Sequence, residues 1–297
     1  MPSAVDIHFS SCVLGNNTVW ATSPSNIQAI LSTRFPDFEL SRSRISAFRP
    51  YTSDGIFSSN GRSHARAIVR PSLSKVHVAN LDIYERHFQN LAALIPRDGS
   101  TVDLQDLFSR MMIDTASDFL FGESVHALDP QQSSTSKAVS EAFNYTSQAV
   151  AFRLQMGTIS FLFPDKKFKK SLSLIHEYVD YFVDKAIAYR ASGEKEIEGK
   201  VGRYVYLREL AKDTGDRRVL RDQIVSILAA GRDTTAALLS LSFWLLLRHP
   251  KVVERLKEEI APLGGYPPSH EQLKGMAYLR WILDESKCQT LSGQSVT

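Results

Sequence analysis

Cysteine is scarce in this 297-residue sequence, which contains only Cys12 and Cys288. Two cysteines form neither a disulfide framework nor a zinc cluster. A net charge of only +3 does not indicate a nucleic-acid partner. Residues 1–6 are too short and too polar for a signal peptide or a membrane anchor. Because 43% of the residues are hydrophobic, we expect a soluble globular domain with a sizeable core. Since no signal peptide is expected, the predicted location is intracellular.

A long apolar run, Val225–Leu247, predicts one buried helix. Its centre carries Arg232 next to Asp233, and burying charges costs free energy unless they are paired or used in function. It also carries Gly231, although glycine inside a helix costs about 1 kcal/mol relative to alanine. We therefore predict that the helix is deformed at this point, as helices often are at functional sites.

Two other interpretations of this run stay open when only its residues are considered. A helix of about 20 residues is long enough to cross a bilayer. The two central charges oppose this, at about 2.5–3.5 kcal/mol each on insertion scales, although intramembrane charges do occur at functional sites. The run is also compatible with an ordinary core helix that tolerates a polar patch.

The rest of the chain predicts a mainly α protein with a small β-hairpin near the N-terminus. Val5–Val13 and Val19–Thr22 favour the hairpin because they are rich in β-branched residues. Ser23 and Pro24 predict a short helix that ends near Leu31. The other expected segments are an irregular basic loop at Pro36–Pro50, helices at Ser63–Val69, His77–Leu94, Leu104–Phe121, Ser136–Gln155 and around Leu172–Ala186, and an exposed connection at Arg190–Tyr204.

Two further helices are expected after the long apolar run. Pro250 suits the first turn of a helix, which continues with apolar residues at helical spacing up to Ile260. Ser269 and Gln272 have the spacing of a capping box and predict the start of another helix.

The segment Ala229–Ala236 reads Ala-Ala-Gly-Arg-Asp-Thr-Thr-Ala and resembles the oxygen-binding helix of the cytochrome P-450 monooxygenases. Other segments resemble that family in the same order: Asp54–Phe57, His64–Pro71, Met112–Gly122 and the helices between Lys251 and Glu285. The amino-acid sequences of these segments most resemble those of the fungal branch that hydroxylates alkanes and fatty acids. The resemblance implies an incomplete cytochrome P-450 fold over residues 1–285, mainly α with the small hairpin.

The resemblance also implies roles for the residues of the motif. Gly231 is expected to be the kink that lets the backbone approach dioxygen, while the acid Asp233 and the alcohol Thr234 relay protons. Thr235 is expected to satisfy a carbonyl that the kink frees. Ala230 is expected to border the haem and, with Ala229, the substrate pocket.

Haem itself is implied as the cofactor, with residues of the segment before Pro71 at its propionates. Arg66 matches the family's arginine, and Arg62 stands where the family usually has a tryptophan, although an arginine can still bind a carboxylate. His64 is a further candidate for a propionate contact, and a solvated surface is the alternative for His64 and for Arg70.

The sequence departs from the family after Glu285, where Glu-x-x-Arg becomes Glu285-Ser286-Lys287-Cys288. The tail at residues 286–297 is polar and small and predicts disorder. The cysteine loop that supplies the iron's axial thiolate in the family is not found, so no metal ligand is assigned. Cys288 is expected to be an exposed thiol on the tail, and Cys12 a small buried residue in a strand.

The family implies an apolar substrate such as an alkane or fatty acid, an NADPH-dependent reductase and attachment to the endoplasmic reticulum. Phe161–Pro164 is followed by Lys166, Lys167, Lys169 and Lys170. Aromatic residues beside lysines favour an anionic membrane surface, whereas a solvated charged turn is equally compatible. The substrate pocket is expected to be lined from this region and from Pro50–Phe57.

Three hypotheses follow from these observations. The chain is part of a monooxygenase whose iron ligand comes from elsewhere, or a non-catalytic fragment, or an unrelated helical membrane or interaction protein whose central helix mimics the motif. We expect family membership, and we expect that these 297 residues alone do not turn over substrate because no thiolate loop is found.

Overall fold

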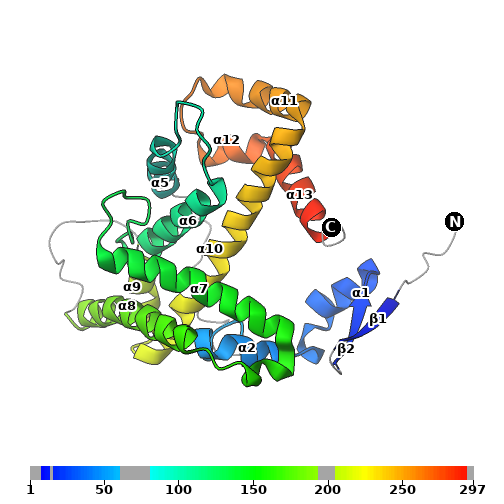
Figure 1. Ribbon diagram of the computed structural model, residues 1–297, viewed down its shortest axis with the longest axis vertical. Coiled ribbons are helices and arrows are strands. Elements are labelled where there is room, and N and C mark those ends of the chain that lie inside the picture. Colours follow the sequence, from blue (N-terminus) through cyan, green and yellow to red (C-terminus); the bar gives the residue numbers. More distant parts are fainter. Residues whose placement is uncertain (1–7, 14–15, 61–80, 193–204, 293–297) are drawn as a thin grey trace.

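The computed structural model describes residues 8–13, 16–60, 81–192 and 205–292. Helices dominate, as predicted, and a two-stranded antiparallel sheet lies near the N-terminus. In its register His8 pairs with Ala21 and Val13 with Asn16, which confirms the expected hairpin. Figure 1 shows the hairpin at one side of the molecule and a long helix, α10 (Arg217–Arg248), running through the middle.

The helices and strands have these bounds in chain order: β1 His8–Val13, β2 Asn16–Ala21, α1 Pro24–Gln28, η1 Ala29–Thr33, η2 Phe35–Asp37, α2 Arg42–Thr52, α5 Asp82–Ala93, α6 Leu104–Phe121, α7 Ser134–Met156, η3 Gly157–Leu162, α8 Lys166–Ala191, α9 Tyr206–Asp213, α10, α11 Pro250–Ile260, η4 Ala261–Leu263, α12 His270–Gly275 and α13 Ala277–Ser292.

The core forms where α10 packs against α6 and α8, with α7 covering α8 (Figure 1). The first half of α10 contributes Ile224, Val225 and Leu228, each almost fully buried, at the i, i+1 and i+4 spacing of one helical face. A second, smaller cluster joins α5 and α6 to Ala236 of α10. The two clusters bury one face of α10 on either side of its central polar residues.

Several helices begin where the sequence places a capping side chain. Asp103 accepts hydrogen bonds from the first turn of α6, and Asp216 does the same for α10. Ser269 and Gln272 form the predicted capping box at the start of α12, and Pro250 occupies the first turn of α11 as expected. Such caps stabilise a helix by about 1 kcal/mol each, which is why these starts are encoded locally.

The expectation of an irregular loop at Pro36–Pro50 is wrong, because residues 42–52 form α2. Ser41 caps this helix by accepting a hydrogen bond from the Arg44 backbone. Ala47 and Tyr51, four positions apart, are buried on one face, and α2 packs against α7 and α10. Tertiary burial therefore stabilises a helix that its charges and prolines argue against.

Two helix ends also differ from the predictions. The helix that starts at Pro24 ends at Gln28 and passes into a π-helical turn at Ala29–Thr33. Beyond Glu285 the predicted disorder is wrong as far as Ser292, because α13 continues to that residue and buries Ser286, whose hydroxyl donates to the Ile282 carbonyl at 2.8 Å. Some predictions lie outside the described residues: the helix at 63–69, the start of the helix at 77–80, the connection at 193–204 and the tail at 293–297.

Among the described residues, α10 alone is long and apolar enough to cross a membrane. It packs against α2, α6, α8 and α13 and buries Asp222 and Arg232 among them. The interpretation as a central core helix therefore accounts for its contacts.

Candidate functional site

The centre of α10 carries a charged pair in which the two partners have different surroundings. The Arg232 side chain is 4% exposed, and its Nη1 donates to Asp233 Oδ1 at 2.7 Å. Its Nη2 donates to the side-chain oxygen of Asn144 on α7. Asp233 keeps 41% of its side-chain surface exposed. The buried charge of Arg232 is therefore neutralised by a carboxylate that stays in reach of solvent, which meets the requirement predicted for this pair.

Thr234 follows the charged pair and lies on the exposed side of α10. Its hydroxyl donates to the Ala230 carbonyl one turn earlier, at 2.7 Å. Back-bonding of this kind satisfies the hydroxyl, although it slightly destabilises a helix and often bends it. The bond to a helix carbonyl that was expected of Thr235 is thus made by Thr234.

The structure describes α10 as one helix from Arg217 to Arg248, so Gly231 does not interrupt it, and the kink expected there stays a prediction. A Cβ built on Gly231 would meet no atom within 4 Å. Glycine is therefore not required here by a close contact in this structure. It leaves open space beside the backbone, next to the carbonyl that Thr234 engages.

The side of α10 that carries Thr234 has an open face, made of residues that repeat at helical spacing. Small side chains come first and larger ones follow: Ala230, Thr234, Ala237, Leu241 and Trp244, each of them exposed or half-buried. The opposite side, with Arg232 and Ala236, is buried. The motif therefore presents its small residues and its hydroxyl to an unfilled side of the helix.

Tyr51 of α2 is a member of this site that no local pattern in the sequence indicates. Its side chain is 3% exposed, and burial raises the pKa of its phenol well above the usual range. The Asp233 carboxylate raises this pKa further, whereas Arg232 opposes the shift. The phenol therefore keeps its proton at neutral pH. On its other side, His176 Nε2 of α8 donates to the Tyr51 carbonyl at 3.2 Å.

A close approach between the loop after α2 and α10 holds Tyr51 in place. A Cβ on Gly55 would lie 1.9 Å from the Ser226 hydroxyl and 3.0 Å from the Asp222 carbonyl. Only glycine fits there without movement of α10 or of the loop. Burial raises the pKa of the neighbouring Asp222, while hydrogen bonds from Ser53 and Asp54 oppose the shift.

Other predicted site residues are not part of this cluster. Arg62, His64 and Arg66 lie outside the described residues, so the expected propionate contacts are not described. Cys288 is exposed on α13. Cys12 belongs to β1, but its side chain is not among those that the structure describes. In the described part of the chain, no three His, Cys, Asp or Glu side chains are grouped so that they could hold a metal ion.

An apolar ridge lies at the other end of the molecule from α11, on η3 and the last turn of α7. We define this η3 ridge by Phe152, Leu154, Phe161, Leu162 and Phe163, all exposed. Phe161 is the most accessible at 75%, and the rings of Phe152 and Phe163 pack edge to face with centroids 5.7 Å apart. The exposed lysines 166, 167, 169 and 170 begin α8 beside it.

Comparison with known proteins matches residues 7–286 to the family model described as Cytochrome P-450. The chain is 37% identical over 287 residues to Cytochrome P-450 monooxygenase fsdH of Fusarium heterosporum, which covers 92% of this chain and 50% of that protein. It is 38% identical to Cytochrome P-450 52A12 of Debaryomyces hansenii, over 93% of this chain and 56% of the relative. Cytochrome P-450 52A5 of Candida maltosa is 40% identical over 88% and 52%. The chain thus spans about half the length of these relatives.

Proposed function

This chain belongs to the cytochrome P-450 family, and we propose that the open face of α10 is the oxygen side of a haem monooxygenase site. The proposed reaction inserts one oxygen atom of O2 into a C–H bond of an apolar substrate such as an alkane or fatty acid. The observation that carries this proposal is the exposure of Thr234 beside the half-exposed Asp233 and the open space at Gly231.

The described residues fit haem on one side only. Small side chains at Ala230, Gly231 and Thr234 leave room for a flat macrocycle against α10. Haem supplies the oxygen and one-electron chemistry when it is bound, with electrons from an NADPH-dependent reductase. Arg66, with Arg62 and His64, is proposed to hold its propionates. Among the described residues, none at this face is proposed as a ligand of the haem iron.

Asp233 is proposed to carry protons from solvent toward the open face. Its carboxylate is 41% exposed, so water reaches it, and its ion pair with Arg232 orients it. A general acid or base must lie within hydrogen-bond reach of its partner or reach it through one water. Asp233 and the next residue, Thr234, are the two groups proposed for such a relay.

Thr234 is proposed to be the last group of this relay. Its hydroxyl now donates to Ala230, and a rotation about one side-chain bond turns it from this carbonyl toward the open face. It then donates a hydrogen bond on that side while accepting one from water. Thr235 is proposed to stabilise the backbone when the helix adapts to a bound group.

The proton-relay proposal predicts that Thr234→Ala uncouples electron consumption from product formation. In a protein that combines these residues with a haem-ligating region, NADPH oxidation should continue while product per NADPH falls about tenfold, since one general acid–base contact contributes about 10²–10⁴-fold to a rate. Thr234→Ser, which keeps the hydroxyl, serves as the control. Normal coupling in the alanine variant would exclude the assignment.

The competence of the 297-residue chain itself is tested separately by adding haem and recording the reduced carbon monoxide difference spectrum. A thiolate-type band would show that the chain supplies the axial ligand. If that band is absent, either because the chain binds haem through another ligand or because it binds no haem, the result would support a non-catalytic role for this chain.

We also propose that the η3 ridge contacts a membrane, in keeping with a location at the endoplasmic reticulum. Exposed aromatic and aliphatic side chains beside lysines suit the interface of an anionic bilayer. Replacing Phe161 and Phe163 together by serine should reduce binding to liposomes about tenfold or more, because each buried CH₂ contributes about 0.8 kcal/mol. Tyr266→Ser is the matched control, because it removes an aromatic residue that is 79% exposed and lies away from the η3 ridge. Equal liposome binding by all three proteins would contradict this contact.

A further inference from the structure

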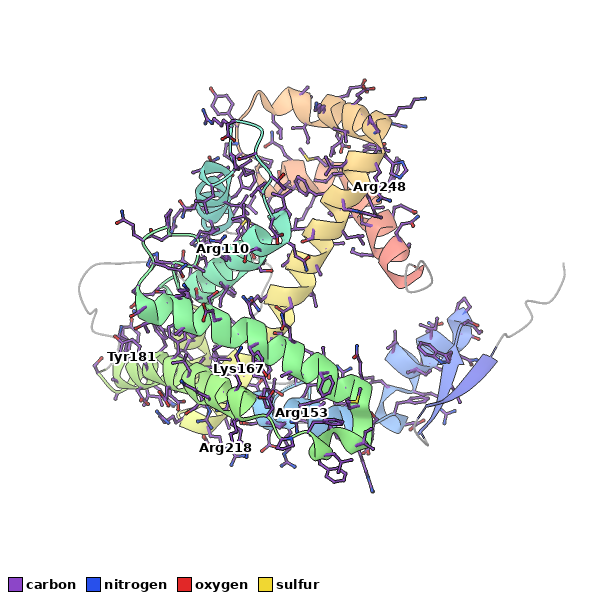
Figure 2. The ribbon with its side chains drawn as sticks, viewed as in Figure 1. Arg110, Arg153, Lys167, Tyr181, Arg218 and Arg248 are labelled. Carbon is purple, nitrogen blue, oxygen red and sulfur yellow. The ribbon has the colours of Figure 1, made fainter. Side chains whose placement is uncertain are left out.

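A shallow basic depression that is open to solvent, called the cavity below, lies between α2 and the last turns of α7, apart from the α10 motif. It has a volume of about 570 Å³ and is lined by Arg42, Ile45, Ser46, Arg49, Pro50 and Arg153. Three guanidinium groups and one hydroxyl therefore face a space that has an apolar wall. Figure 2 shows Arg153 at this end of the molecule, beside Lys167 and far from Arg248.

The positive charge of this cavity is only partly neutralised. Arg49 donates to Asp54 at 3.1 Å, and both side chains are exposed. In the described part of the chain, neither Arg42 nor Arg153 forms an ion pair. Asp54 also pairs with Arg218 of α10, so its charge is shared. The cavity thus retains about two positive charges, more than one carboxylate would neutralise.

Arg153 is held in position before any ligand binds. Its guanidinium lies over the Phe168 ring, 5.2 Å from the ring centroid. Its Nε is buried and has no hydrogen-bond partner. An unsatisfied buried donor of this kind is unfavourable, and because Nε has no exposed surface, a ligand in the cavity would bind the terminal Nη groups instead. The ring contact also reduces the conformational freedom that Arg153 would lose on binding.

Guanidinium groups select anions by geometry as well as by charge. Their planar N–H pairs match the oxygens of phosphate and carboxylate and bind them bidentately. A phosphate monoester carries about 1.5–2 negative charges near neutral pH and three acceptor oxygens. It therefore matches two unpaired arginines and the Ser46 hydroxyl better than a single carboxylate does.

The cavity and the η3 ridge both take residues from the end of α7. Arg153 lies in the last turn of α7, directly before η3, and α2 also contacts η3. If the Phe161 ring of the η3 ridge inserts below the headgroup layer of a bilayer, Arg153 comes to the depth of the lipid phosphates. The lysines at the start of α8 attract the same anionic surface but line no part of the cavity.

We propose that the cavity between α2 and α7 binds the phosphomonoester headgroup of an anionic membrane lipid while the η3 ridge rests on the bilayer. This inference rests on the proposed membrane contact and adds to it a headgroup preference. Arg42 and Arg153 bind the phosphate oxygens, Ser46 donates to them, and Ile45 and Pro50 contact the glycerol or adjoining carbons. Generic attraction to a charged surface would show no such preference.

The test compares vesicles of phosphatidylcholine that contain phosphatidic acid or phosphatidylserine at matched surface charge. The intact chain is expected to bind the phosphatidic acid vesicles about tenfold more tightly, since a phosphomonoester presents about 1.5–2 negative charges and three acceptor oxygens to the arginines, whereas the phosphodiester of phosphatidylserine carries about one charge on two free oxygens. Arg153→Gln and Arg42→Gln should each remove most of this preference. Arg248→Gln, an arginine stacked on Trp244 at the other end of the molecule, and Lys166→Gln should preserve it.

The outcomes separate the headgroup site from the membrane contact. Equal binding to both anionic vesicles, or a preference that survives in both arginine variants, would overturn the headgroup site while vesicle binding through Phe161 still stands. Failure to bind any vesicle would overturn both. A soluble arm uses glycerol phosphate in calorimetry: binding that requires Arg153, without a vesicle preference, would assign the cavity to a free phosphate ester and overturn the lipid source. Circular dichroism of each variant confirms that it is folded.

Discussion

Replacing Asp233 by alanine is expected to lower the free energy of unfolding by about 2 kcal/mol, whereas replacing Arg232 by methionine should cost about half as much. The reason is the unequal burial of the pair, at 41% and 4% exposure. Without Asp233, the Arg232 charge stays buried with only the Asn144 amide oxygen to compensate it. Without Arg232, the remaining carboxylate is hydrated.

The double variant provides the decisive comparison. Once Arg232→Met has removed the buried charge, Asp233→Ala should add little further destabilisation, so the two effects should not be additive. Urea unfolding of the chain and its three variants measures this cycle. Additive effects, or a larger loss from Arg232→Met than from Asp233→Ala, would show that the pair is not organised by this difference in burial.

Asp114→Ala is expected to destabilise the chain by about 3 kcal/mol. This carboxylate of α6 is 1% exposed and accepts hydrogen bonds from the backbone of Ala127 at 2.7 Å and of Leu128 at 2.9 Å. Hydrogen bonds to charged groups contribute about 1.5–3 kcal/mol each, and both N–H groups would lose their acceptor in a buried position. The loop after α6 should detach and expose part of the core around Val125.

Two controls define this second prediction. Asp114→Asn keeps one acceptor oxygen and should lose about half as much stability. Asp106→Ala removes an exposed carboxylate from the same helix and should change stability by about 0.5 kcal/mol at most. Hydrogen exchange of the Ala127 and Leu128 amides measures the local effect. Unchanged protection of both amides in Asp114→Ala would contradict the role assigned to this carboxylate.

Local signals in the sequence account for much of the helical framework. The helix predicted at Leu104–Phe121 has the same bounds in the structure, because Asp103 caps its first turn and Gly122 ends it with a φ of 75°, which favours glycine. The capping box at Ser269 has the same local origin. Helix α2 was not predicted because its stability depends on burying Ala47 and Tyr51 against helices far along the chain.

By itself, the sequence determined that the middle of the long apolar helix carries an arginine and an acid that must be paired or used, beside a glycine and two hydroxyls. The tertiary structure decided how the two charges are paired and which of them is buried. It turned Arg232 inward to Asn144, 88 positions away, and left Asp233 partly in solvent. It also placed Tyr51 beside them and continued α10 as one helix through Gly231. Helical spacing specifies which residues share a face, but only the packing of α2, α6 and α8 against α10 determines which face is buried.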